Sequence, residues 1–149
     1  MDQKVQKKYV DDGLGFPVVI LNAPMIKVRG QWVLHVNYND YQQAILQLLA
    51  HKPSKLTANE VRFVRTYFQM TVRAFAERFA VKHTAVLKWE SKGDLSTHMN
   101  WSTEKDIRMF ILDELKKKAS DVLALYRSLK ETVEESVEPV VLDSDDMAA

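Results

Sequence analysis

The chain has 149 residues, of which 46% are hydrophobic and 28% charged, and its formal net charge is +1. This is enough for one globular domain with tails, and the absence of cysteine excludes disulfides and thiolate metal sites. No stretch approaches the ~20 apolar residues that cross a bilayer, and residues 1–12 lack the apolar run of a signal peptide. We therefore expect a soluble, cytoplasmic protein.

The N-terminal part reads as a polar tail followed by a small sheet. Residues 1–12 are expected to form a flexible N-terminus. Residues 13–36 contain three short β-prone runs separated by turn residues, which predicts a small antiparallel meander. Because so small a sheet is not stable alone, it needs the helices or a second copy to pack on.

A helix is predicted over residues 41–51, before Pro53 ends it. Four apolar residues nearly encircle this helix: Ile45, Leu46, Leu48 and Leu49. That pattern favours burial on more than one side, under the meander or in a dimer interface. Residues 13–51 are therefore interpreted as a partner-binding or dimerisation module.

Three short amphipathic helices are predicted next, over residues 58–68, 71–79 and 82–91. Each shows apolar residues at helical spacing, and the connections are only a few residues long. The first begins with a predicted capping box, in which Thr57 caps the helix and Glu60 follows three residues later. Thr71 is the candidate cap of the second, and Gly93 follows the third where a left-handed residue is commonest.

The second and third of these helices have the spacing of a helix-turn-helix, in which the second helix of the pair enters the major groove of DNA. Ala80-Val81 forms the turn, and Ala85, Val86 and Trp89 hold the groove-reading helix in place. Five residues face outward from that helix and are predicted to contact DNA: Lys82, His83, Thr84, Leu87 and Lys88. Contacts to the DNA backbone are predicted for Arg73, Lys92 and Arg78.

Basic charge is concentrated in this segment. Residues 52–93 hold nine Lys and Arg against three acids, which gives +6, whereas the whole chain carries only +1. Phosphate binding needs such a concentration. The alternative is a generic three-helix core with a solvated basic face.

The residue pattern of this segment also resembles that of a known family. L-T-x-x-E-x-R-F-x-R over residues 56–65, and F-A followed by a spaced W-E over 75–90, are similar to the Xre-type (lambda-repressor-like) helix-turn-helix, in particular to antitoxin-regulators of the MqsA/HigA kind. The resemblance covers roughly residues 16–93. The matching residues are Leu56, Thr57, Glu60, Arg62, Phe63, Arg65, Phe75, Ala76, Val81, Val86, Lys88, Trp89 and Glu90.

The resemblance implies a mainly α fold: a lambda-repressor-like helix-turn-helix bundle with a small N-terminal antiparallel β meander. It also implies a dimer that binds operator DNA and a cognate toxin protein. This chain departs from the family pattern at Phe68-Gln69, where Leu-Gly is usual, at Val72, where Gln is usual, and at Ala80, where Gly is usual. The zinc site of some members needs paired cysteines, so no metal and no cofactor is expected.

Two more helices and an acidic tail are predicted after residue 93. Thr103 is the predicted cap of a core-closing helix. A second helical pattern over residues 119–132 either continues it, or packs back on the domain, or dimerises. The tail has seven acids and no Lys or Arg, which is typical of disorder, and is interpreted either as solubilising or as adding a strand to a partner.

No Gly-rich phosphate loop, nucleophile elbow or HExxH motif is present, so we do not expect an enzyme. The leading hypothesis is an antitoxin of a type II toxin–antitoxin system that binds its toxin and represses its own operon as a dimer. The alternatives are a protein-interaction module on a degenerate helix-turn-helix scaffold and a toxin-independent repressor. The expected organisation is a flexible N-terminus (1–12), a partner-binding module (13–51), a DNA-binding domain (52–130) and a disordered tail (131–149).

Overall fold

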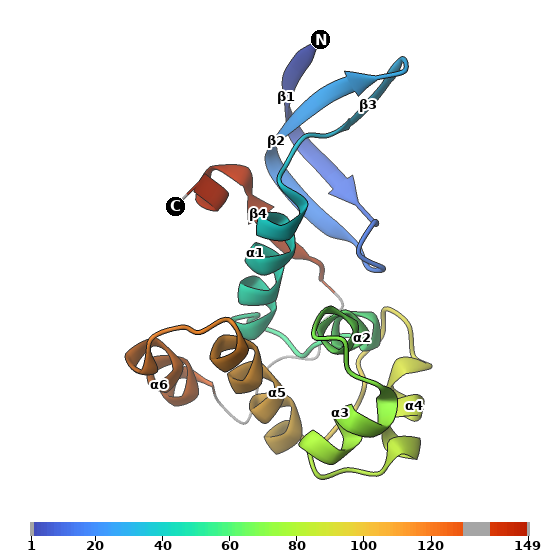
Figure 1. Cartoon of the computed structure of the whole chain (residues 1–149), viewed down its shortest axis with the longest axis vertical. Helices are drawn as coiled ribbons and strands as arrows, with labels where there is room; N and C mark the ends of the chain where they lie inside the picture. The colour runs from blue at the N-terminus through green and yellow to red at the C-terminus, as the bar shows by residue number, and fades with distance from the viewer. Residues whose placement is uncertain (1, 130–137, 149) are drawn as a thin grey trace. The chain divides into compact units, whose positions relative to one another are not determined.

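A computed structural model describes residues 2–129 and 138–148, which form two compact units (Figure 1). The first unit is Met1–Leu48 with Pro139–Ala149, and the second is Leu49–Glu138. In chain order the described elements are β1 (Gln3–Asp11), β2 (Val18–Val28), β3 (Gln31–Leu34), α1 (Tyr38–Ala50), α2 (Ala58–Tyr67), α3 (Val72–Arg78), α4 (His83–Glu90), α5 (Trp101–Glu114), α6 (Ala119–Ser128), β4 (Val140–Asp143) and the 3-10 helix η1 (Ser144–Ala148).

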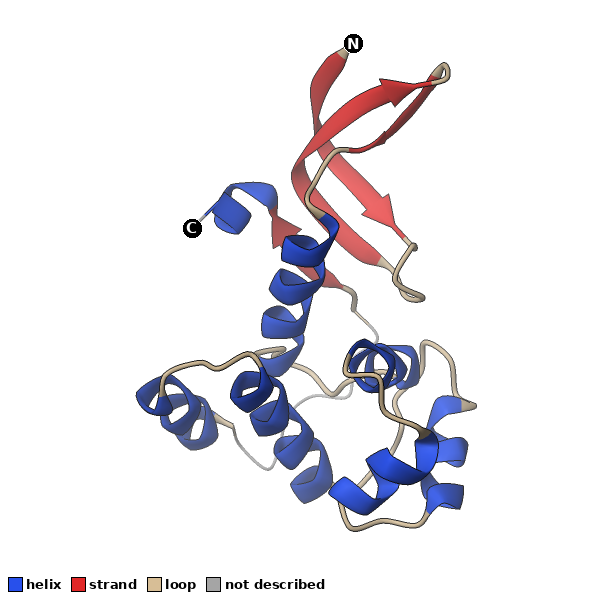
Figure 2. Cartoon of the chain, in the orientation of Figure 1, coloured by secondary structure: helices blue, strands red, loops and turns tan. Residues whose placement is uncertain are grey.

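The four strands make one mixed sheet in the first unit, with β2 at its centre (Figure 2). β1 pairs antiparallel with β2 along one edge. The other edge of β2 is shared: β4 pairs parallel with its first half, and β3 pairs antiparallel with its second half. β2 therefore has hydrogen-bonded neighbours on both sides along most of its length.

Asn22 marks the point on β2 where the second edge changes partner. Its φ of 53° lies in the left-handed region, which shifts the alternation of side chains along the strand. Val18 and Ile20 before it, and Ala23 and Met25 after it, are all buried. The same face of the sheet thus stays apolar on both sides of the irregular residue.

Helix α1 lies on this buried face. The Tyr41 hydroxyl donates a hydrogen bond of 2.7 Å to Asp11 Oδ2 of β1, and Ile45 and Leu46 are fully buried. Burial, followed by the hydrogen bond to Asp11, raises the pKa of the Tyr41 phenol. Tyr41 therefore stays neutral and keeps its proton for that bond.

The fold-class prediction was wrong. The structure is about 48% helix and 22% strand. Its described residues form a four-stranded mixed sheet and six α-helices. This is not a lambda-repressor-like helical bundle with a small antiparallel meander.

The main reason for the error is that two strands come from segments expected to be flexible. β1 occupies most of residues 1–12, and β4 lies in the acidic tail. Lysines on β1 suit an edge strand but hide its β pattern, whereas Val140 and Leu142 of β4 are buried and supply the apolar contact. Residues 131–137 and 149 of the predicted tail lie outside the described residues.

The second unit contains the last two residues of α1 and helices α2 to α6. Its C-terminal helices correct one prediction and decide one point that the sequence left open. Asn100, not Thr103, caps α5, because its side chain accepts from Ser102 N. Lys116, with φ of 57°, ends α5, so that α6 is a separate helix. Of the helices that the structure describes, none is long and apolar enough to cross a membrane.

Two buried ion pairs fix the segment that leads into α2. Lys52 Nζ lies 2.8 Å from Glu60 Oε1, and Arg108 Nη2 lies 2.9 Å from Glu104 Oε2. The Arg108 guanidinium also donates to the backbone carbonyls of Lys52 and Ser54. Removing one partner of such a pair leaves a buried charge uncompensated, which is strongly destabilising. These four charged residues therefore act as part of the core.

Candidate nucleic-acid interface

The start of α2 is held by the predicted capping box, which the structure confirms. The Thr57 side chain accepts from Glu60 N, and the Glu60 carboxylate accepts from Thr57 N at 2.8 Å. Two further N–H groups of the first turn donate to carbonyls of the loop after α4: Ala58 N to Leu95 O and Asn59 N to Gly93 O. The loop that follows α4 thus closes the N-terminus of α2.

Helix α3 is capped as predicted by Thr71, whose side chain accepts from Ala74 N. At the other end, Ala80 N donates to Glu77 O and Val81 N to Ala76 O. Ala80 has φ of 56°. These two bonds and the left-handed residue make a Schellman motif, which usually has glycine at that position. The turn between α3 and α4 therefore places an alanine in a conformation that suits glycine.

Helix α4 presents two different faces. Val86 and Trp89 are buried, whereas Thr84, Leu87 and Lys88 are exposed, and Leu87 has 53% of its surface accessible. Thr84, Leu87 and Lys88 follow the i, i+3, i+4 spacing of one helix face. The outward face of α4 thus combines a hydroxyl, an apolar side chain and an ammonium group.

The structure places the other predicted contact residues around that face. Lys82 is exposed and stands at the N-cap position of α4. Arg73 is exposed on α3. His83 and Lys92, by contrast, are half-buried, the first at the start of α4 and the second just after its end.

An ion-pair cluster fixes the C-terminal end of α4 to α2. Arg65 binds both carboxylate oxygens of Glu90 at 2.8 Å and also donates to Met70 O. Arg62 Nε lies 3.1 Å from Glu90 Oε1. Because the Arg65–Glu90 contact is bidentate and largely buried, it fixes the orientation of α4 better than a single surface ion pair does.

Several basic residues that the charge count assigned to DNA serve the fold instead. Lys52, Arg62 and Arg65 are in the ion pairs described above. Arg78 lies over the Phe79 and Phe110 rings and 3.5 Å from Asp106 Oδ2. Three exposed candidates on α3 and α4 make none of these contacts: Arg73, Lys82 and Lys88.

Ser91 was not among the predicted contact residues. It is exposed, follows Thr84 by seven residues and lies on the same side of the helix. Its hydroxyl donates to Lys88 O at 2.6 Å. The helical spacing from Thr84 was the signal that identifies it.

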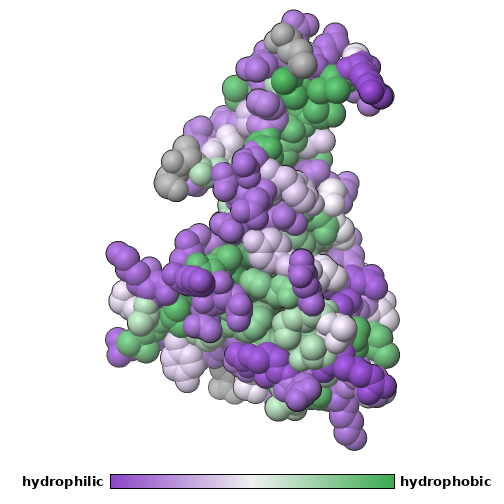
Figure 3. Space-filling view, viewed as in Figure 1, coloured by the Kyte–Doolittle hydropathy of each residue, from purple (hydrophilic) through white to green (hydrophobic). Residues whose placement is uncertain are grey.

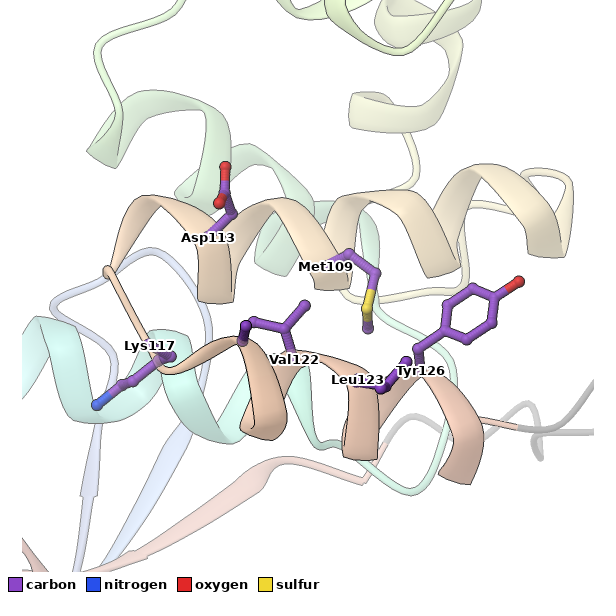
Figure 4. A pocket seen from close by; sticks show the side chains of 7 residues that line it. Met109, Asp113, Lys117, Val122, Leu123 and Tyr126 are labelled. Atoms are coloured by element: carbon purple, nitrogen blue, oxygen red, sulfur yellow. The ribbon is translucent and has the colours of Figure 1, made fainter.

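A second surface feature of this unit is a recess of about 530 Å³ between α5 and α6. Figure 4 shows Met109 of α5 between the two helices, beside Val122 and Tyr126 of α6. Leu125 of α6 is buried, whereas Tyr126 is exposed, with Lys105 Nζ 3.9 Å from its ring centroid. Helix α6 therefore packs back on its own unit and leaves one side exposed.

Across residues 2–129 and 138–148, no group of three or more His, Cys, Asp or Glu is placed to hold a metal ion. No family model, no curated protein and no solved structure matches the chain.

Proposed function

We propose that this chain is a sequence-specific DNA-binding regulator that inserts α4 into the major groove. The observation that carries the proposal is the outward face of α4. Thr84, Leu87 and Lys88 are all exposed there, and none of the three is part of the buried core. Leu87 has more than half of its surface accessible, and exposure of that apolar surface to water does not stabilise the protein. In the major groove the same side chain would make apolar contact with a thymine methyl group.

The supporting residues give this face the order that base reading needs. Glu90 fixes α4 to α2 through Arg65, and the Schellman motif at Ala80 sets the turn before α4. On this proposal Thr84 and Leu87 contact base edges. Lys82, Lys88 and Arg73 approach guanine or phosphate. The protein works in the cytoplasm as a dimer that reads two half-sites.

The test is a salt-titrated binding assay on DNA of the gene's own promoter region and on scrambled DNA of equal length. Specific binding tighter by a factor of ~10³ or more supports the proposal. Thr84→Ala with Leu87→Ala should remove the preference between the two DNAs, whereas Lys88→Ala should weaken binding to both. Lys117→Ala, an exposed lysine beyond α5, is the matched control. Equal, weak binding of the wild type to both DNAs would refute the proposal and favour the protein-interaction alternative.

The antitoxin role is the more specific part of the proposal. It is supported by the resemblance and by the division into two compact units, because the first unit offers a protein partner a surface on a different unit from α4. Replacing Lys82, His83 and Thr84 together with alanine should abolish operator binding while co-expression still relieves the toxicity of the neighbouring gene product. If the wild type relieves no toxicity but represses the promoter, the chain is a toxin-independent repressor.

A further inference from the structure

One face of the sheet in the first unit is apolar, and the described residues of that unit leave much of it exposed. This outer face, opposite to the face that carries α1, is defined by six side chains: Val5 and Val10 of β1, Leu21 and Ile26 of β2, Val33 of β3 and Val141 of β4. The four valines among them are between 39% and 69% exposed. Figure 3 shows that apolar residues also reach the surface around the strands on the side that carries α1.

The sequence of β2 is that of a strand covered on both faces. It reads VVILNAPMIKV, so that apolar residues stand at nearly every position and not at every second one. Strands with one solvated face alternate apolar and polar residues, whereas strands buried on both faces read as continuous apolar runs. α1 covers one face, and the composition of β2 therefore calls for a second layer on the other.

Charge on the outer face indicates which molecule supplies that layer. The register places Lys8 of β1, Leu21 of β2 and Asp143 of β4 in one row across the sheet. Lys8 and Asp143 thus stand level with each other at opposite edges. A two-fold axis parallel to β2 places Lys8 of each copy opposite Asp143 of the other, with Leu21 against Leu21 at the centre. The face is complementary to itself, as a two-fold interface requires.

We propose that two copies of this chain associate through the outer face, sheet against sheet. Eleven residues of β2 span ~36 Å and three strands span ~14 Å. The face therefore measures roughly 500 Å² per copy, and the pair buries roughly 1,000 Å², which is at the lower limit of specific interfaces. We expect a dissociation constant on the order of micromolar. The inference concerns the first unit alone and does not depend on DNA binding by α4; it adds the surface through which two copies meet.

The test measures the dimer dissociation constant of the full chain by sedimentation equilibrium without DNA. Lys8→Glu places like charges opposite each other twice and should raise the constant at least tenfold. Adding Asp143→Lys to Lys8→Glu reverses both charges and should restore association. Val10→Lys, at an exposed edge position, should also raise the constant at least tenfold. Leu95→Lys is the control for an exposed apolar residue of the second unit.

Each outcome decides the proposal. Loss of association with Lys8→Glu and its recovery in the double variant establish the self-complementary interface. A wild type that remains monomeric at ~100 μM overturns it and leaves the face to a different protein. A dimer that Val10→Lys and Lys8→Glu leave unchanged overturns it as well, because association then uses another surface. DNA binding is measured separately through the α4 variants, so that failure of one proposal is distinct from failure of the other.

Discussion

Three helices of the second unit are followed by a residue in the left-handed backbone conformation that is not glycine. This predicts how glycine at these positions changes the free energy of unfolding. Gln69, Ala80 and Lys116 follow α2, α3 and α5, and all three have φ of 56–57°. At each, two hydrogen bonds complete a Schellman motif: for example, Gln69 N donates to Thr66 O, and Met70 N donates to Arg65 O. Glycine is the usual residue at this position because it has no Cβ.

The expected increase in the free energy of unfolding is the difference between two opposing effects. A residue other than glycine in the left-handed conformation costs ~1–2 kcal/mol, whereas glycine lowers stability by ~0.4–1 kcal/mol through the greater freedom of its unfolded chain. Ala80→Gly should therefore raise the free energy of unfolding by about 0.5–1 kcal/mol. Gln69→Gly and Lys116→Gly should do the same, and the triple variant should gain about 2 kcal/mol, since distant sites usually add.

The assay is urea unfolding of each variant, followed by circular dichroism. Ala74→Gly is the matched control, because Ala74 is exposed within α3, where glycine costs ~1 kcal/mol. Ala80→Gly and Ala74→Gly should therefore have opposite signs. Equal destabilisation by both would refute the reasoning, since the turn at Ala80 would then not hold a left-handed residue.

Two further predictions concern β4 and the buried Glu104. Leu142→Ala should lower the stability of the first unit by ~2–4 kcal/mol in thermal unfolding, because Leu142 is buried beside β2; an unchanged midpoint would mean that the C-terminal strand does not dock. Burial raises the pKa of Glu104 above its usual 4.5, although Arg108 lowers it. The stability from Glu104 is therefore full below about pH 4.5 and is lost as the pH rises through the raised value. Glu104→Gln should lack this part of the pH dependence in urea unfolding, and identical pH profiles would contradict it.

Local signals identified the helices well. The side chains of Thr57 and Thr71 cap α2 and α3 as predicted, and Gly93 adopts the left-handed conformation expected after α4. Each depends on a few neighbouring residues, and that information is present in a short window of sequence. Thr103 failed for the same reason: Asn100, three residues earlier, is an equally good cap and takes that role.

The sheet and the buried charges depend on contacts that no short window contains. β4 pairs with β2 across more than a hundred residues, and an acidic composition around it predicts disorder. Lys52 and Arg108 read as surface cations until their partners Glu60 and Glu104 are brought to them by folding. Composition therefore led to the wrong fold class. The charge count assigned to DNA several basic residues that form ion pairs within the fold.

The salt dependence of DNA binding distinguishes two numbers of phosphate contacts. One is the nine basic residues counted in the sequence, and the other is the three that the structure leaves for DNA. If all nine basic residues of 52–93 contacted phosphate, the logarithm of the binding constant would fall with a slope of about −8 per copy against the logarithm of salt concentration. The three exposed cations that make none of the ion pairs described above, Arg73, Lys82 and Lys88, give a slope of about −3 per copy. We expect the smaller slope in the promoter-binding titration, reduced by about one unit per copy in Lys88→Ala. A slope near −8 would contradict this reading, because Arg62 and Arg65 would have to leave Glu90 on binding, and α4 would lose the ion pairs that orient it.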